Sequence, residues 1–90
     1  MLVRVRATSL NFRDIAIARG KYFTGPVTED LIPLSDGAGE IVEVGEGVSE
    51  LSTGDRVAGI FFQNWFDGHP PAMLASMGSP LEGMLSEYRV

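Results

Sequence analysis

The first residues of the chain alternate between apolar and charged side chains, and this alternation predicts a β-strand over residues 2–7. Val3 and Val5 fall on one face of this strand, whereas Arg4 and Arg6 fall on the other. Further strands are predicted over residues 37–44, 56–62 and 84–90. Within 37–44, apolar and acidic side chains share each face, which is typical of a strand in a curved barrel.

A helical pattern covers residues 11–19. Asn11 is of a residue type that caps helix N-termini, and Asp14, at the third helical position, brings the segment close to a capping box. Gly20 suits the position that ends a helix. By i, i+3, i+4 spacing, one face of the helix is apolar and consists of Phe12, Ile15 and Ala16.

Glycine-rich turns are predicted at residues 45–47 and 53–55, and a loop at 21–30. Residues 31–34 are expected to form a short extended piece, and 72–77 one or two helical turns. Strands therefore dominate, with short helices between them. The fold class is mainly β with short helices, as a partly open β-barrel in a single domain over residues 1–90.

Composition narrows the possible partners. The chain of 90 residues has a net charge of −5, which argues against nucleic acid as a partner. Its apolar runs fall short of the ~20 residues that span a bilayer, so no membrane association is expected. The sequence contains no cysteine, which excludes disulfides and thiolate metal ligands and fits a reducing cytoplasm.

Three segments carry a family resemblance: residues 7–14 (ATSLNFRD), 32–48 (IPLSDGAGEIVEVGEGV) and 53–57 (TGDRV). Together they resemble the GroES-like catalytic domain of medium-chain NAD(P)-dependent dehydrogenases and quinone reductases. Each segment alone is a weak signal, but three in the order of the family are a strong one. The resemblance implies a GroES-like barrel, and the chain begins after strands that the family usually has, so truncation at the N-terminus is expected.

Two positions depart from the zinc enzymes of this family. Asn11 stands where those enzymes have a metal-binding cysteine, and Ser35 stands where their Gly-His-Glu triplet supplies a histidine. Serine is a poor zinc ligand, and the single carboxylate of Asp36 does not make a metal site. The resemblance is therefore to the zinc-less branch, which includes quinone oxidoreductases, and no zinc is expected.

That branch is characterised by Asn-(Phe or Tyr)-x-Asp, which matches residues 11–14 here. The resemblance implies catalytic roles for Asn11, Asp14 and Tyr22, where Tyr22 is the active-site phenol, and cofactor binding by Asn11 and Arg13. The amide of Asn11 would hydrogen-bond the nicotinamide ribose or a substrate carbonyl. An alternative stays open, in which Asn11 is only a helix N-cap and Asp14 only its capping partner.

Other candidate positions are expected to be structural. Ser35 is expected to be a structural hydroxyl, and His69 a solvated loop histidine. The aromatic cluster is expected to pack in the core or at a domain interface, and consists of Phe61, Phe62, Trp65 and Phe66. Gaps in the core are expected to be filled by Met73, Met77 and Met84.

The resemblance implies the substrate-side domain of a zinc-independent NAD(P)H-dependent oxidoreductase, which acts on a carbonyl, alcohol or quinone by hydride transfer. The Rossmann cofactor domain of that family is absent from these 90 residues, so the chain alone is not expected to bind NAD(P)H or to be active. The alternative is a stand-alone, non-catalytic β module that self-associates. A homodimer through an open sheet edge is expected in either case. The substrate, and the choice between NAD and NADP, stay open.

Overall fold

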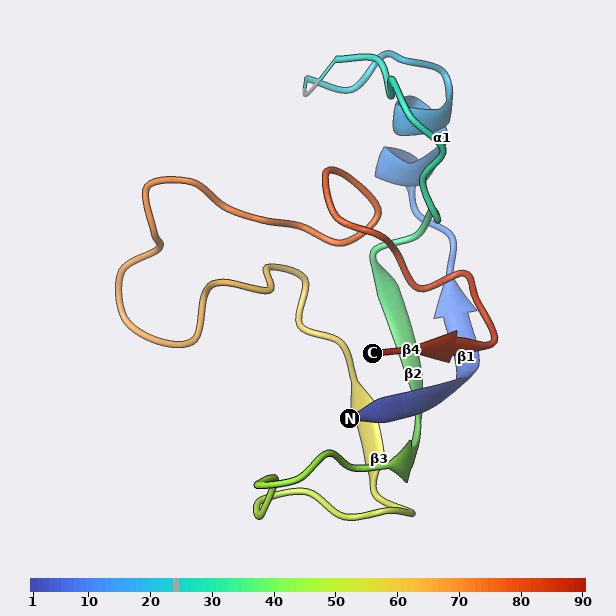
Figure 1. Ribbon diagram of the computed structural model, residues 1–90. Coiled ribbons are helices and arrows are strands. Elements are labelled where there is room, and N and C mark those ends of the chain that lie inside the picture. Colours follow the sequence, from blue (N-terminus) through green and yellow to red (C-terminus); the bar gives the residue numbers. More distant parts are fainter. Residues whose placement is uncertain (24) are drawn as a thin grey trace.

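The computed structural model describes residues 1–23 and 25–90, so Thr24, in the predicted loop over 21–30, lies outside the described residues. The elements are β1 (Leu2–Ser9), α1 (Phe12–Ala18), β2 (Asp36–Glu43), β3 (Arg56–Ala58) and β4 (Tyr88–Arg89). The described strands form one sheet in the order β3-β2-β1-β4, and each neighbouring pair is antiparallel (Figure 1). Over residues 1–23 and 25–90 the fold is mainly β with one short helix, which confirms the predicted fold class.

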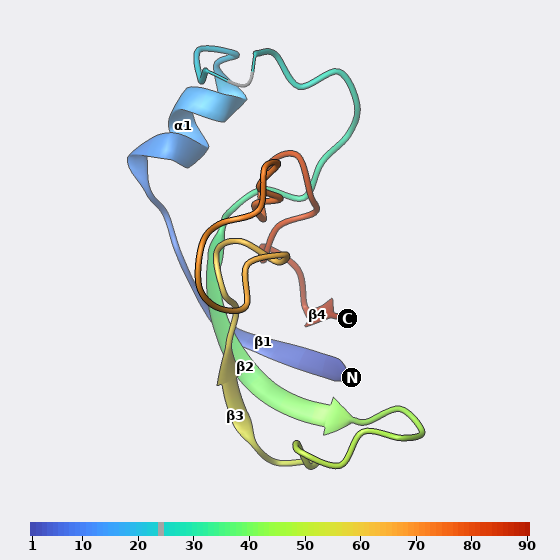
Figure 2. The same cartoon turned by 90° about the vertical axis from the view of Figure 1, so that its left-hand side faces the viewer.

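The long strands β1 and β2 are curved rather than flat, and the sheet bends away from α1 at one end (Figure 2). Their register shifts between Leu2 and Val3 and again between Val5 and Ala7, and such bulges increase the local twist of a strand. Gly39 lies opposite Val5 and is buried. A Cβ atom on Gly39 would overlap the backbone carbonyl of Arg4, so the close approach of β1 and β2 depends on this glycine.

The apolar core lies between the sheet and the segments that follow β3. Its most deeply buried large side chain is Ile41, in the second half of β2, with 1% of its surface exposed. The other buried apolar residues are Val3, Ala16, Ile17, Leu34, Met77 and Met84. Met77 and Met84 fill gaps as predicted, whereas Met73 is 84% exposed and does not.

The helix begins and ends where the sequence predicts. Asn11 is the N-cap with extended backbone dihedrals, Arg19 is the C-cap, and Gly20 follows with a φ of 66°. Its buried face is different from the predicted one, however. Asp14, Ala16 and Ile17 point inward, whereas Phe12 is 82% and Ile15 43% exposed. Spacing alone does not select between these two faces, and the polar contacts of Arg13 and Asp14 described below lie on the inward one.

Three predicted elements are shorter or absent. The strand predicted over 56–62 ends at Ala58, although the amide of Gly59 still donates to the carbonyl of Gly37 at 3.0 Å. Residues 72–77 are not helical: instead, Ser76 forms an isolated bridge with Phe62. The C-terminal strand is limited to Tyr88–Arg89.

The early part of the predicted C-terminal strand pairs with the extended piece 31–34 instead of joining the sheet. The amides of Gly83, Met84 and Leu85 donate to the carbonyls of Ile32, Leu34 and Pro33, at 2.7, 2.8 and 3.1 Å. Leu34 has a φ of 72°, which is unusual for a residue with a side chain and interrupts any regular strand there. The predicted turns at 45–47 and 53–55 are present, with positive φ at Gly47 and Gly54.

The aromatic cluster is not part of the core. Phe61 and Phe62 are partly buried with their rings edge to face, but Phe66 is 84% exposed. Of the two predicted roles, packing in the core is therefore wrong for Phe66, and packing at a domain interface stays a prediction. His69 is exposed in the loop, as predicted. Within residues 1–23 and 25–90, no helix has the length and apolar character needed to cross a membrane.

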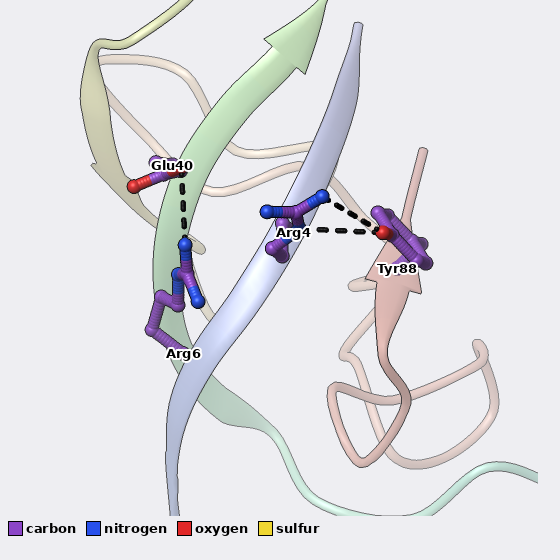
Figure 3. A network of polar contacts seen from close by, with 4 residues as sticks. All are labelled: Arg4, Arg6, Glu40 and Tyr88. Atoms are coloured by element: carbon purple, nitrogen blue, oxygen red, sulfur yellow. Dashed lines mark hydrogen bonds and ion pairs between the residues drawn. The ribbon is translucent and has the colours of Figure 1, made fainter.

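Polar side chains on the outer face connect the strands (Figure 3). Arg4 on β1 donates from Nε and Nη2 to the hydroxyl of Tyr88 at 3.2 and 3.1 Å, and its guanidinium lies 5.5 Å from the centre of the Tyr88 ring. Arg6 forms an ion pair with Glu40 at 3.2 Å, but both side chains are well exposed, so this pair adds little stability. The Arg4 contact is exposed as well, and it joins the two-residue strand β4 to β1.

We expect Gly39→Ala to lower the free energy of unfolding by about 2–3 kcal/mol, because the added methyl group overpacks the contact between β1 and β2. Gly45→Ala is the matched control, since a Cβ at Gly45 meets no atom within 4 Å. Urea unfolding followed by circular dichroism measures both. Equal stability of the two variants would contradict the close approach at Gly39.

Candidate functional site

Two of the predicted catalytic residues, Asn11 and Asp14, lie where the end of β1 and the start of β2 meet the start of α1. In the register of the sheet, Ser9 at the end of β1 faces Asp36 at the start of β2. Two residues after Ser9, Asn11 begins the helix. The strand pairing therefore brings Asn11 next to Asp36, although 25 residues separate them in the sequence.

The side-chain amide of Asn11 hydrogen-bonds residues at the ends of both strands. Its Nδ2 donates to Asp36 Oδ2 at 2.6 Å, and also to Ser9 Oγ at 3.1 Å. A hydrogen bond to a charged acceptor is stronger than one between neutral groups, so the contact with Asp36 fixes the orientation of the amide. From the sequence, Asp36 is expected near the site, but no hydrogen-bond partner is predicted for it. The strand register, which the sequence alone does not fix, identifies that partner as Asn11.

Asp14 supports the same group from the helix side. Its Oδ2 accepts a hydrogen bond from the backbone N–H of Asn11 at 2.8 Å, which is the carboxylate half of a capping box. Asp14 is only 6% exposed. The capping role that the sequence left as an alternative is thus present for Asp14. The geometry is also compatible with a role in orienting Asn11, because the two functions use the same contact.

Two buried oxygen atoms near this junction are unpaired in the described part of the chain. They are Oδ1 of Asp14 and Oγ of Ser35, and Ser35 is only 1% exposed. A buried polar atom without a partner costs free energy, so such atoms are uncommon in stable folds. Ser35 immediately precedes Asp36 in the sequence, and Asp14 is the residue that caps Asn11.

Arg13 and Tyr22 form a second part of the site. The guanidinium of Arg13 lies 5.2 Å from the centre of the Tyr22 ring, and Tyr22 is partly buried. Arg13 also donates to acceptors in residues 76–79, which lie far away in the sequence. The structure thus connects Tyr22 to α1 through Arg13. The sequence did not predict these acceptors, because they lie far from Arg13 along the chain and no local pattern indicates the contact.

The side chains at this junction do not suit zinc. Asn11 offers an amide and Ser35 a neutral hydroxyl, and the carboxylate of Asp36 is engaged with the Asn11 amide at 2.6 Å. Zinc sites in proteins use thiolate, imidazole and carboxylate ligands in a tetrahedral arrangement. Among the residues that the structure describes, no group of three or more His, Cys, Asp or Glu side chains is arranged to hold a metal ion.

Comparison with known proteins gives consistent matches. The family profile for the alcohol dehydrogenase GroES-like domain matches residues 1–90. A zinc-type alcohol dehydrogenase-like protein of Schizosaccharomyces pombe is 40% identical over 92 residues, which cover 100% of this chain and 26% of that protein. A quinone oxidoreductase-like protein 2 homolog of Nematostella vectensis is 43% identical over 58 residues, which cover 64% of this chain and 16% of that protein.

A solved structure agrees with these matches. The crystal structure of a provisionally assigned alcohol dehydrogenase from Sinorhizobium meliloti 1021 superposes with a TM-score of 0.86 and 33% sequence identity. The superposition covers 98% of this chain and 27% of that one. The chain therefore spans about a quarter of the length of the full-coverage relatives that it matches.

We expect Asn11→Asp to lower the free energy of unfolding by about 1–3 kcal/mol at neutral pH, because two carboxylates then face each other across the strand ends. Aspartate caps a helix about as well as asparagine, so the cap itself is not lost. The double variant Asn11→Asp/Asp36→Asn restores an amide–carboxylate pair with exchanged partners and should recover the loss. Chemical denaturation measures both variants, and a double variant no more stable than Asn11→Asp would show that the pair does not form.

Proposed function

The chain belongs to the alcohol dehydrogenase GroES-like domain family, and on this basis we propose that it is the substrate-side domain of an NAD(P)H-dependent oxidoreductase that works without zinc. The observation that carries the proposal is the hydrogen bond between Asn11 and Asp36. It engages the side chain of Asn11, which stands at one position where the resemblance places a zinc ligand of related enzymes, and that of Asp36, the residue after Ser35 at the other such position. The name of the Schizosaccharomyces pombe relative refers to zinc-type enzymes, so this chain would differ from that type in its catalytic group.

The amide of Asn11 is suited to polarise a carbonyl. Its contact with Asp36 at 2.6 Å holds the group in place, whereas its contact with Ser9 Oγ at 3.1 Å is exposed and weaker. A substrate oxygen can replace Ser9 as the second acceptor of Nδ2 without disturbing the first contact. A fixed N–H donor aimed at the oxygen where negative charge develops lowers the barrier of the reaction.

The remaining residues support this group. When bound, NAD(P)H supplies the hydride, and this chemistry belongs to the cofactor. Asp14 fixes the backbone of Asn11 through the contact at 2.8 Å, and we propose that the phenol of Tyr22 provides a proton to the reduced oxygen. Cofactor contacts of Asn11 and Arg13 stay predictions from the family resemblance.

The use of an amide N–H in place of a metal ion also limits which substrates the site can reduce. A metal ion is a stronger Lewis acid than an amide N–H, so loss of the metal favours substrates whose reduced form already delocalises its charge. Quinones and conjugated carbonyls have this property, and simple alcohols do not. The similarity to the quinone oxidoreductase-like protein of Nematostella vectensis points in the same direction.

The test is a reductase assay on the full product of the reading frame that encodes this chain, with menadione, a conjugated ketone and NADH or NADPH. We expect turnover that withstands prolonged treatment with a zinc chelator and a zinc content far below one per chain. Asn11→Ala should reduce kcat by about a hundredfold, the loss typical of one oxyanion donor. Thr8→Ala, an exposed change on β1, is the control. Loss of activity on chelation, followed by recovery with zinc, would reject the proposal.

A second candidate function is self-association without catalysis. In the described part of the chain, β4 faces β1 at Val3 and Arg4, and the amide of Val5 donates to the carbonyl of Glu87 at 2.9 Å, which leaves the edge of β1 beyond Val5 open. A shallow cleft of about 420 Å³ lies between residues 5–8 of β1 and residues 85–87. Open strand edges pair with other chains, and we propose a second copy of this chain as the partner.

Light scattering after size-exclusion chromatography measures this association, and we expect the mass of a dimer. Thr8→Lys should shift the chain to a monomer, because a lysine on an open edge opposes pairing with another strand. Thr53→Lys adds the same charge in a turn remote from this edge and should leave the dimer intact. A monomeric parent chain at its highest soluble concentration would rule out this function.

A further inference from the structure

The guanidinium of Arg13 is used almost entirely inside the protein. Nη1 donates to the carbonyl of Met77 at 2.9 Å, and Nη2 donates to Ser76 Oγ and to the carbonyl of Ser79, both at 3.0 Å. Both terminal nitrogens thus have acceptors on one short segment, 63 to 66 residues further along the chain. A planar fork with several donors suits such a cluster of acceptors.

Two aromatic rings complete the surroundings of this cation. The central carbon of the Arg13 guanidinium lies 4.9 Å from the centre of the Phe61 ring and 5.2 Å from that of Tyr22. Both distances are within the range of favourable cation–π contacts. Arg13 therefore connects α1 to Tyr22 and to both ends of the loop that follows β3, at Phe61 and at residues 76–79.

The acceptors of Arg13 are deeply buried. Met77, Ser76 and Ser79 are 3%, 7% and 8% exposed, respectively. Ser76 also donates its hydroxyl to the carbonyl of Ser79 at 2.6 Å, so the segment is a compact polar turn. Water has little access to these carbonyls, so without Arg13 the carbonyl of Met77 would lose its donor, whereas that of Ser79 would keep the hydroxyl of Ser76.

The same contacts fix the base of a protruding arm, which consists of residues 62–76 (Figure 1). The base is closed by main-chain hydrogen bonds, from Gln63 to Ala75 at 2.8 Å and from Met77 to Phe61 at 3.2 Å. Arg13 binds both sides of this base, through the ring of Phe61 on one side and the carbonyl of Met77 on the other.

We infer that Arg13 is a positioning residue, which holds Tyr22 and the base of the arm against α1, rather than a contact for the phosphates of the cofactor. Its catalytic consequence rests on the proposed function, because it acts through Tyr22. Its structural consequence does not. The two parts can therefore be measured separately.

The structural part is tested by hydrogen exchange on the 90-residue chain. In Arg13→Ala, exchange at the amides of Gln63, Met77 and Leu81 should become about tenfold faster, because these hydrogen bonds lie at the base that Arg13 closes. Exchange at Ile41 and Gly54, whose hydrogen bonds lie in the distant sheet and turn, should not change. This pattern distinguishes local opening from general unfolding.

Arg19→Ala is the matched control, since Arg19 is an exposed arginine at the other end of the same helix. Arg13→Lys keeps the charge but not the planar fork, and should show intermediate exchange. If Arg13→Ala exchanges like the parent chain at the base of the arm, the inference is overturned. If Arg13→Ala does not fold, Arg13→Lys decides by the same comparison.

Tyr22 provides a second structural readout, and the split between kcat and the KM for the cofactor provides one that a purely structural role would not move. With fluorotyrosine incorporated, the ¹⁹F signal of Tyr22 should shift and broaden in Arg13→Ala, whereas that of Tyr88, which contacts Arg4, should not. In the full product of the reading frame, Arg13→Ala should lower kcat and leave the KM for NAD(P)H unchanged. A raised cofactor KM with unchanged exchange would assign Arg13 to the cofactor and overturn the inference. A parent protein without activity would reject the proposed function, while the exchange and ¹⁹F results would still decide the structural part.

Discussion

The register between β1 and β2 is the constraint on which the rest of the structure depends. It places Ser9 opposite Asp36, so that the turn from β1 into α1 delivers Asn11 to the carboxylate of Asp36. The shift between Val5 and Ala7 sets this register at the site end of the strands, and Gly39 allows the close approach just before it. A slip by one residue would turn each side chain of β2 to the opposite face and separate the pair.

The helix depends on its neighbours rather than on its own length. Seven residues are too few for a stable helix in water, so α1 forms because the fold holds it. Asp14 caps its start, Arg13 attaches its side to residues 76–79, and Ile17 buries an apolar side chain. Phe12 lies on the opposite face and is exposed.

The sequence predicted what local chemistry determines. The strand in residues 2–7, both ends of α1 and the glycine turns at 45–47 and 53–55 follow from patterns a few residues long, and all are present. The family followed from three short segments in order, and the comparisons confirm it. The acceptors of Arg13 and the pairing of 83–85 with 32–34 connect distant residues, so no local pattern could predict them. The prediction of a helix at 72–77 is wrong for the same reason, because a long-range bridge to Phe62 holds Ser76 extended.

Met77 and Met84 pack against Gly59 and Gly37, respectively. They restrict substitution at these two glycines to different degrees. A Cβ atom on Gly59 would meet the terminal methyl group of Met77 at 2.6 Å, and a flexible side chain can move that group aside. A Cβ atom on Gly37 would lie 2.7 Å from the Cβ of Met84, which cannot move without its backbone. Over evolutionary time, position 59 can therefore accept a small side chain by itself. Position 37 is bound to remain glycine unless the chain at Met84 moves with it.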